Sequence, residues 1–224
     1  MKTKLLAAAI AVTGLVALAP TTYAQSIDVK VIGTITPSVC TPSIAGGGVV
    51  DYGTIPAATL NQTAFNVLPE KGVAFTITCP DGPAHVGVTV VDNESSSMVA
   101  GITAAIAAGF TDGYNYGLGT VSGANVGGYV MRMKQGSFTV DGTATPTISS
   151  NDSGTTWLSS TSGGMGHFAG SMVSWGTTPA AGPTMGALFS GTLGVQAVLN
   201  KGSALPLTAD VPLAGSATMT LVYL

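Results

Sequence analysis

The first stretch of alternating apolar and polar residues lies at residues 25–36. Apolar residues and glycine occupy the odd positions from 27 to 35, and Ile32 is the one apolar residue at an even position. Successive side chains of a strand point to opposite faces, so this spacing predicts an amphipathic strand. In an exported chain that starts at residue 25, no earlier segment pairs with it. We therefore expect another copy of the protein to bury its apolar face, which consists of Ile27, Val29, Val31, Gly33 and Ile35.

Alternation recurs along the chain as far as its last residues. Residues 73–79 and 86–91 predict strands, and the Cys-Pro-Asp-Gly-Pro turn at 79–83 separates them. The last eight residues predict a final strand, with Ala217, Met219, Leu221 and Tyr223 on one face. Shorter runs predict strands at residues 49–55, 64–68, 114–119, 127–134 and 137–140, and one or two strands within 187–199. Strands at this spacing, separated by Gly and Pro turns, favour an all-β sandwich.

Two stretches carry a weaker pattern. In residues 97–108 the alanines favour a helix, whereas Gly101 and the β-branched residues oppose one, so we expect irregular structure or a short helix. Residues 143–183 are rich in Gly, Ser, Thr and Pro. We expect long surface loops there, carrying one or two strands.

Residues 1–24 have the pattern of a secretory signal peptide. Lys2 and Lys4 precede an apolar run, and small residues at Thr22 and Ala24 predict cleavage after Ala24. A membrane anchor is the alternative, but the run is short for a span of about 20 residues and no basic cluster follows it. We therefore expect a bacterial protein that is exported through the periplasm to the cell surface.

The charge of the expected mature chain argues against a nucleic-acid partner. Without Lys2 and Lys4, five basic residues remain against ten acidic ones, a net charge of −5, and the five are scattered. Phosphate binding needs clustered cations. Charged residues are only 8% of the whole chain, below the roughly 25% of ordinary soluble domains. This composition suits a surface that packs against other subunits.

The two cysteines, Cys40 and Cys79, predict a disulfide, because an even count in an exported chain is typical of one. Closing a loop of this length is worth roughly 4 kcal/mol on the chain-entropy model. A metal pair or a catalytic thiol is the alternative, but neither cysteine has a cluster of His or acidic residues nearby in the sequence.

Little in the sequence favours an enzyme. His85 follows a proline-rich turn and His167 lies in a glycine-rich loop, where we expect both to be solvated. The chain has no nucleophile-elbow or zinc-protease motif and no supported pair of carboxylates, so we expect no cofactor and no metal. Trp157, Phe168 and Trp175 are candidates for stacking against a sugar, although core packing is the favoured interpretation.

Several pieces in order resemble the chaperone–usher pilus subunits. They are the alternating residues 31–35, Cys40 shortly after Gly33, Cys79 at the end of an alternating strand, and a penultimate aromatic residue, Tyr223. The Gly-Gly-Gly-Val-Val-Asp-Tyr-Gly run at 46–53 is similar to the β-fimbrial branch of that family. The match covers most of the mature chain and fades at residues 95–183.

The resemblance implies an immunoglobulin-like sandwich that lacks its last strand and so leaves a groove. A periplasmic chaperone fills the groove first, and at the outer-membrane usher the N-terminal strand of the next subunit replaces it. Ile27, Val29, Val31 and Gly33 would then form the donor strand, and Met219, Leu221 and Tyr223 would border the groove and face the chaperone. The implied organisation is a signal peptide at 1–24, a donor extension at 25–36 and a pilin domain at 37–224.

The implied function is a structural subunit of a surface fimbria for adhesion or biofilm formation. Identical or related subunits would be its partners in the fibre, and the sequence names no receptor. A tip or adaptor adhesin of the same pathway is the main alternative. An outer-membrane barrel is less favoured, because such barrels commonly finish on an aromatic residue and this chain finishes Tyr223-Leu224.

Overall fold

The protein was analysed as a computed structural model, which describes residues 30–34 and 39–224. The chain divides into two units, residues 1–36 and residues 37–224. Within the first unit, residues 30–34 form neither helix nor strand, and the side chains of Val31 and Ile32 are 93% and 91% exposed. The predicted signal peptide and the predicted donor residues Ile27 and Val29 lie outside the described residues.

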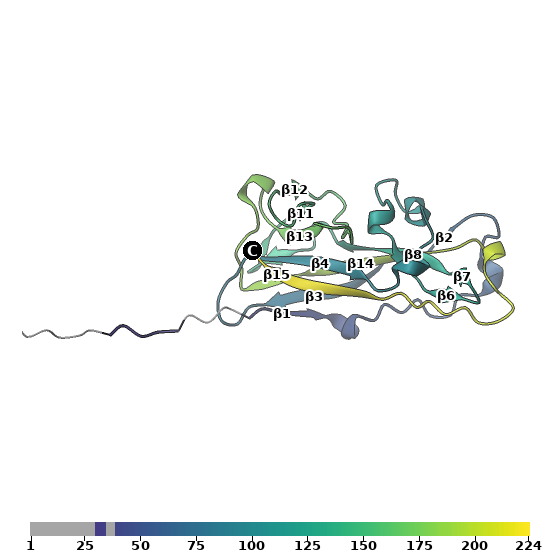
Figure 1. Cartoon of the computed structure of the whole chain (residues 1–224), viewed down its shortest axis with the longest axis horizontal. Coiled ribbons are helices and arrows are strands. Elements are labelled where there is room, and N and C mark those ends of the chain that lie inside the picture. The colour runs from purple at the N-terminus through teal and green to yellow at the C-terminus, as the bar shows by residue number, and fades with distance from the viewer. Residues whose placement is uncertain (1–29, 35–38) are drawn as a thin grey trace, which may run out of the picture. The chain divides into compact units, whose positions relative to one another are not determined.

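Antiparallel strands dominate the second unit, as Figure 1 shows. The larger sheet, called the first sheet below, has the strand order β1-β3-β14-β8-β5, with β2 and β9 beside β14 and β10 beside β9. Its strands are β1 (Thr41–Ile44), β2 (Asn66–Val67), β3 (Lys71–Thr78), β5 (Tyr116–Gly117), β8 (Gly127–Met133), β9 (Thr139–Val140), β10 (Thr143–Ala144) and β14 (Leu188–Leu199).

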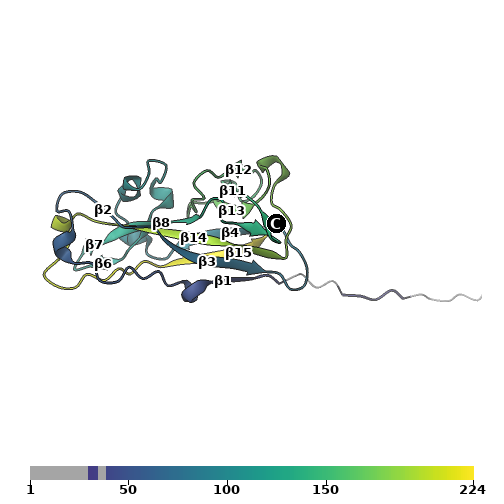
Figure 2. The same ribbon diagram turned by 180° about the vertical axis from the view of Figure 1, so that it is seen from behind.

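The second sheet has the order β12-β11-β13-β4-β15. Its strands are β4 (Val86–Asp92), β11 (Thr147–Ser150), β12 (Leu158–Ser159), β13 (Met172–Trp175) and β15 (Ala217–Tyr223). A separate hairpin pairs β6 (Thr120–Val121) with β7 (Ala124–Asn125). Figure 2 shows both sheets from behind. The prediction of an all-β protein is therefore confirmed.

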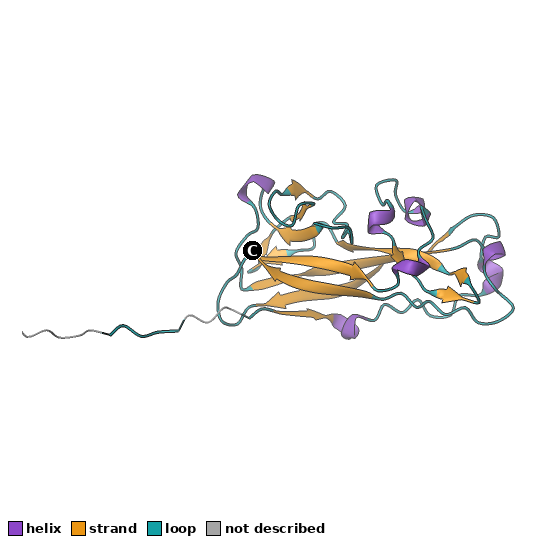
Figure 3. Ribbon diagram, in the orientation of Figure 1, coloured by secondary structure: helices purple, strands orange, loops and turns teal. Residues whose placement is uncertain are grey.

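Helical structure in the described residues is confined to short 3-10 turns between strands (Figure 3). They are η1 (Ala45–Gly48), η2 (Ala57–Thr59), η3 (Ser95–Ser97), η4 (Ile102–Ala105), η5 (Asp112–Tyr114), η6 (Pro179–Ala181) and η7 (Gly202–Ala204). The expectation for residues 97–108, irregular structure or a short helix, is confirmed. Ile102 of η4 is buried close to β8, so this segment covers part of the first sheet.

Aromatic side chains from both sheets form the centre of the core. Trp175 of β13 is fully buried, and its ring centroid lies 5.1 Å from Phe138 and 5.4 Å from Phe189 of β14. Phe75 of β3 lies 6.2 Å from Trp175. Such clusters supply much of the apolar area that a domain buries. Trp175 is therefore a core residue and not a sugar-stacking surface, as the favoured interpretation had it.

The expectation for residues 143–183 is wrong in part, and the expectation for residues 187–199 is confirmed. Residues 143–183 were expected to form long surface loops carrying one or two strands. Strands are present, but β11 and β13 are internal strands of the second sheet, and Met165, Met172 and Val173 are buried. Tertiary packing here overrides a composition typical of loops, because Trp175 and its neighbours belong to the core. Residues 187–199, for which one or two strands were predicted, form one strand of 12 residues, β14.

Candidate functional site

An open groove runs along one side of the second unit and consists of two hollows. The first hollow has a volume of about 550 Å³, and its floor is formed by apolar side chains of β3, β8 and β14. The second has a volume of about 850 Å³ and lies between residues 49–60 and residues 205–213. Val50, Tyr52 and Leu213 line both hollows, so the two are continuous.

The walls of the first hollow come from segments far apart in the sequence. One wall carries Ile44 at the end of β1 and the glycines of η1, and the opposite wall carries Ala217 and Met219 of β15. The residues that line this hollow are Ile44, Gly47, Gly48, Val50, Tyr52, Val73, Leu118, Tyr129, Met131, Leu193, Val195, Ala197, Leu213, Gly215, Ser216, Ala217, Thr218 and Met219.

Both walls are strand edges. Among the described residues β15 pairs only with β4, and β1 pairs only with β3. An edge strand presents unpaired backbone N–H and C=O groups to any further strand. The groove therefore combines an apolar floor with backbone groups that are free to pair.

The segment between β1 and η2 corrects one prediction. Residues 49–55 were expected to form a strand, but they form none. The segment has no hydrogen-bonding partner strand among the described residues, and without a ladder an extended segment is not a strand. In place of a ladder, Lys71 donates from its Nζ to the carbonyl oxygen of Asp51, and this ammonium lies 5.2 Å from the Tyr52 ring centroid.

Tyr52 fixes this wall to the floor of the groove. Its hydroxyl donates to the carbonyl oxygen of Val195 at 3.0 Å and accepts from the backbone N–H of Ala197 at 3.1 Å. Both groups belong to the part of β14 that lies between its pairing with β3 and its pairing with β2. The segment that connects β2 to β3 contains Pro69, which has no N–H to donate. Burial raises the pKa of the Tyr52 hydroxyl above its usual 10, so it remains a donor at neutral pH.

We expect Tyr52→Phe to lower the free energy of unfolding by about 1–3 kcal/mol, because two backbone groups of β14 lose their hydrogen-bonding partner. Urea unfolding followed by tryptophan fluorescence measures this change. Tyr114→Phe is the matched control, since the Tyr114 ring packs edge-on against Phe110 and its hydroxyl forms no hydrogen bond within the described residues. Equal midpoints for the two variants would contradict the role assigned to the Tyr52 hydroxyl.

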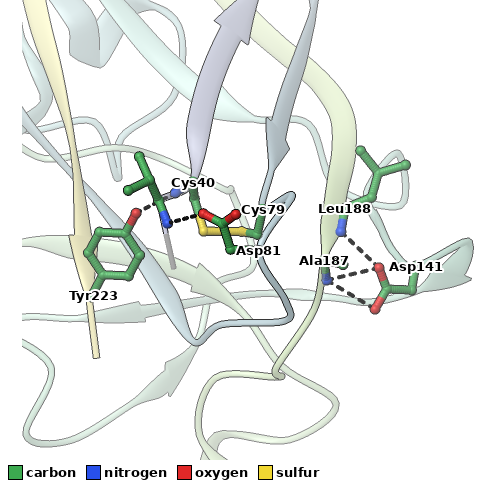
Figure 4. Close-up of a disulfide and its surroundings, with 8 residues drawn as sticks. Cys40, Cys79, Asp81, Asp141, Ala187, Leu188 and Tyr223 are labelled. Carbon is green, nitrogen blue, oxygen red and sulfur yellow. Dashed lines mark hydrogen bonds between the residues drawn. A yellow bond between two sulfur atoms is a disulfide. The ribbon is translucent and has the colours of Figure 1, made fainter. Parts of the chain in front are cut away.

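At one end of the groove the two walls come together at the disulfide (Figure 4). Cys40 and Cys79 are bonded, with their Cα atoms 4.1 Å apart, which confirms the predicted pair. The backbone N–H of Cys40 donates to the hydroxyl of Tyr223, and the N–H of Val39 donates to the Asp81 carboxylate at 3.3 Å. This end of β15 is thus held against the start of β1.

A second carboxylate near the disulfide holds the start of β14. Asp141 accepts hydrogen bonds from the backbone N–H groups of Ala187, at 3.0 Å, and Leu188, at 2.8 Å (Figure 4). An ionised acceptor makes such bonds stronger than those between neutral groups. These hydrogen bonds give Asp141 a structural role.

The predicted site residues occupy different positions relative to the groove. Met219 lines the first hollow, Leu221 is half-buried, and Tyr223 lies at the closed end. Val31 and Gly33 are exposed in the first unit. Alternation found the β15 residues, but it missed Tyr52, Tyr129 and Met131 of the groove floor and wall. For Tyr52, the available signal in the sequence was its position within the Asp-Tyr-Gly run at 51–53.

Both histidines are held by the backbone. His85 Nδ1 lies 2.8 Å from the carbonyl oxygen of Pro183, and His167 Nε2 lies 3.0 Å from that of Asn115. The expectation that they are solvated is wrong, because both rings are half-buried and hydrogen-bonded. Phe168 and Trp157 are half-buried as well, and Phe168 packs edge-on against Tyr114.

The described residues contain no group of three or more His, Cys, Asp or Glu side chains placed to hold a metal ion. Nor does any helix within residues 30–34 and 39–224 have the length and apolar character needed to cross a membrane.

Comparison with known proteins gives one family and two relatives. Residues 29–142 match the family described as "Protein of unknown function (DUF1120)", and this range includes both cysteines and residues 46–60 of the groove wall. Protein GltF of Escherichia coli strain K12 is 36% identical over 104 residues, which cover 45% of this chain and 40% of GltF. The uncharacterized protein YhcF of the same strain is 33% identical over 76 residues, 34% of this chain and 31% of YhcF. The match thus spans less than half of each relative.

Proposed function

The chain belongs to the DUF1120 family of proteins of unknown function, and we propose that it is a structural subunit of a chaperone–usher fimbria. In this proposal the subunits polymerise by donor-strand exchange, in which an extended segment of one copy occupies the groove of the next. The observation that carries the proposal is the open groove, whose apolar floor lies beside the unpaired edge of β15.

The order of the strands supports an immunoglobulin-like sandwich that lacks one strand. One sheet has the order β1-β3-β14-β8, and β4 and β15 end the other sheet. A further strand beside β15 would complete the second sheet and cover Met219, Met131 and Tyr129 in the first hollow. Strand addition of this kind takes its affinity from backbone hydrogen bonds and its specificity from pockets for alternate side chains.

The donor in the proposal is the extension, residues 25–36. Its odd residues Ile27, Val29 and Val31 would enter the groove, and Gly33 would permit a close backbone approach. Val31 is 93% exposed within its unit, so it has apolar surface available for burial. A slip by one residue would place the charged side chains of Asp28 and Lys30 against the apolar floor, so insertion in that register is unfavourable.

The energies are large enough to drive assembly. Burying each of the three apolar side chains contributes about 1.5–3 kcal/mol, and each added ladder hydrogen bond contributes about 1 kcal/mol. A typical domain is stable by only about 5–15 kcal/mol. We therefore expect an unfilled subunit to need a periplasmic chaperone in its groove, and a filled subunit to be durable. Delivery through an outer-membrane usher would place the fibre at the cell surface.

Deleting residues 25–31 tests the proposal. We expect this variant to fold with its chaperone and to accept a donor strand, but not to donate one, so that fibres fail when it is the only copy expressed. Electron microscopy of the cell surface gives the readout. Asp28→Asn is the control, because it leaves the apolar positions intact. Fibres of normal length from the deletion variant would contradict donor-strand exchange through these residues.

A further inference from the structure

The two hollows of the groove differ in charge. The first hollow is lined by no charged side chain, whereas Asp51 and Asp210 line the second. Both are exposed at the protein surface. Asp51 is partly engaged, because its Oδ1 accepts from the backbone N–H of Gly53 at 2.7 Å. Asp210 forms no hydrogen bond or ion pair within the described residues.

Carboxylates without a partner are rare among the described residues. Glu70 pairs with Arg132, and most described aspartates accept hydrogen bonds from backbone N–H groups. Those aspartates are Asp51, Asp81, Asp92, Asp112, Asp141 and Asp152. Among the described residues, Asp210 and Glu94 are the two acidic residues whose side chains form neither a hydrogen bond nor an ion pair. Glu94 does not line the groove.

Most of the described basic side chains also have a partner. Arg132 and Lys134 lie beside Glu70, Lys71 is held at Asp51, and Lys201 lies 5.5 Å from the Phe65 ring centroid. Lys30 in the extension is exposed, and it forms no ion pair with another described residue. The extension thus carries an available cation, and the groove carries an available anion.

Apolar alternation leaves the register of insertion open. A slip by one residue reverses the faces, but a slip by two residues keeps the apolar face inward and exchanges one of Ile27, Val29 and Val31 for another. Such a slip moves the strand by about 6.6 Å along the groove. A charge on the outward face distinguishes these registers, because an ion pair needs close approach of its two groups.

On the premise that the groove takes the extension of another copy, we propose that Lys30 of one copy pairs with Asp210 of the next and so selects the register. With Val29 and Val31 directed into the groove, Lys30 points outward to the rim, where the Asp210 carboxylate is exposed. The pair is solvent-exposed, so its contribution is modest and sensitive to salt. Lys30 and Asp210 are positioning residues and do not supply the main binding energy.

The test measures, by light scattering at low and high salt, the assembly of the mature chain released from its purified complex with the chaperone. Asp210→Asn is expected to weaken assembly about two- to five-fold at low salt, and the difference from the wild-type chain should disappear at about 0.5 M salt. Glu94→Gln removes the same charge outside the groove and should leave assembly unchanged. Lys30→Glu should weaken assembly as Asp210→Asn does. The double variant Lys30→Glu with Asp210→Lys restores the pair with its charges reversed and should recover assembly.

Two results would overturn the pairing. One is equal assembly of Asp210→Asn and Glu94→Gln at low salt, and the other is a double variant no better than the single Lys30→Glu. Deleting residues 25–31 distinguishes failure of the ion pair from failure of the proposed function. If that deletion stops assembly while the charge variants have no effect, donor-strand exchange stands and the ion pair is wrong. If the deletion has no effect either, the proposed function is wrong as well.

Discussion

Appending a second copy of residues 25–36 after Leu224 through a flexible Gly/Ser linker is expected to raise the melting temperature by at least about 10 °C. The appended strand would fill the groove of its own chain and pair with the free edge of β15. Three buried apolar side chains contribute about 1.5–3 kcal/mol each, and each kcal/mol raises the melting temperature of a domain of this size by about 2–4 °C. Differential scanning calorimetry measures the shift.

Two controls make this result specific. The linker alone should leave the melting temperature unchanged. A linked segment of the same composition, reordered so that the apolar residues no longer alternate, should give little of the gain, because a strand buries only one of its faces in the groove. An equal rise for the ordered and reordered segments would sink the idea that the groove reads alternate side chains.

Replacing both cysteines, Cys40→Ser with Cys79→Ser, is expected to lower the free energy of unfolding by about 4 kcal/mol. The bond spans 39 positions of the chain, and its loss releases the loop entropy of the unfolded state. The loss also frees the start of β1, whose N–H donates to the Tyr223 hydroxyl. Urea unfolding of the oxidised wild-type chain and the double variant gives the difference.

The double variant avoids a single free thiol, which would form disulfides between molecules. Wild-type protein kept reduced is a second measure, since it should unfold at the same urea concentration as the variant. A difference below about 1 kcal/mol between the oxidised and the variant chain would show that the disulfide does not stabilise this wall of the groove.

Alternation predicted the strands whose one face lies in the core. Residues of β3 and β15 alternate in the sequence because Phe75 and Met219 face inward while their neighbours along the strand are more exposed. Cysteine count and an expected export signal predicted the disulfide. These signals are local in the sequence, so one chain sufficed to find them.

The glycines of β14 have roles that the sequence did not predict. Gly191 and Gly194 both lie inside the strand at close contacts. A Cβ at Gly191 would lie 2.5 Å from the Phe138 ring, and one at Gly194 would lie 3.0 Å from the Glu70 carboxyl carbon. These glycines serve packing and not chain reversal, and the partner that requires each one is more than 50 positions away.

The groove could be predicted in its elements but not in its shape. Met219 was expected at its border, whereas the roles of Tyr52 and Leu213 depend on segments that approach one another only in the folded chain. Residues 49–55 have the composition of a strand but no ladder, because the neighbouring position that a partner strand would take is the groove itself. Sequence periodicity predicts which face of a strand a side chain lies on, but it does not predict which segment lies beside that strand.

The junction of Cys40 with Tyr223 bears on how uniform an assembled filament can be. Because β15 and the start of β1 meet there, a segment inserted as proposed would meet a physical stop at this junction. A head-to-tail contact of this kind is heterologous and repeats without closing unless its rotation forms a ring. With the same stop in every subunit, the deepest possible insertion would be the same at every joint along the polymer.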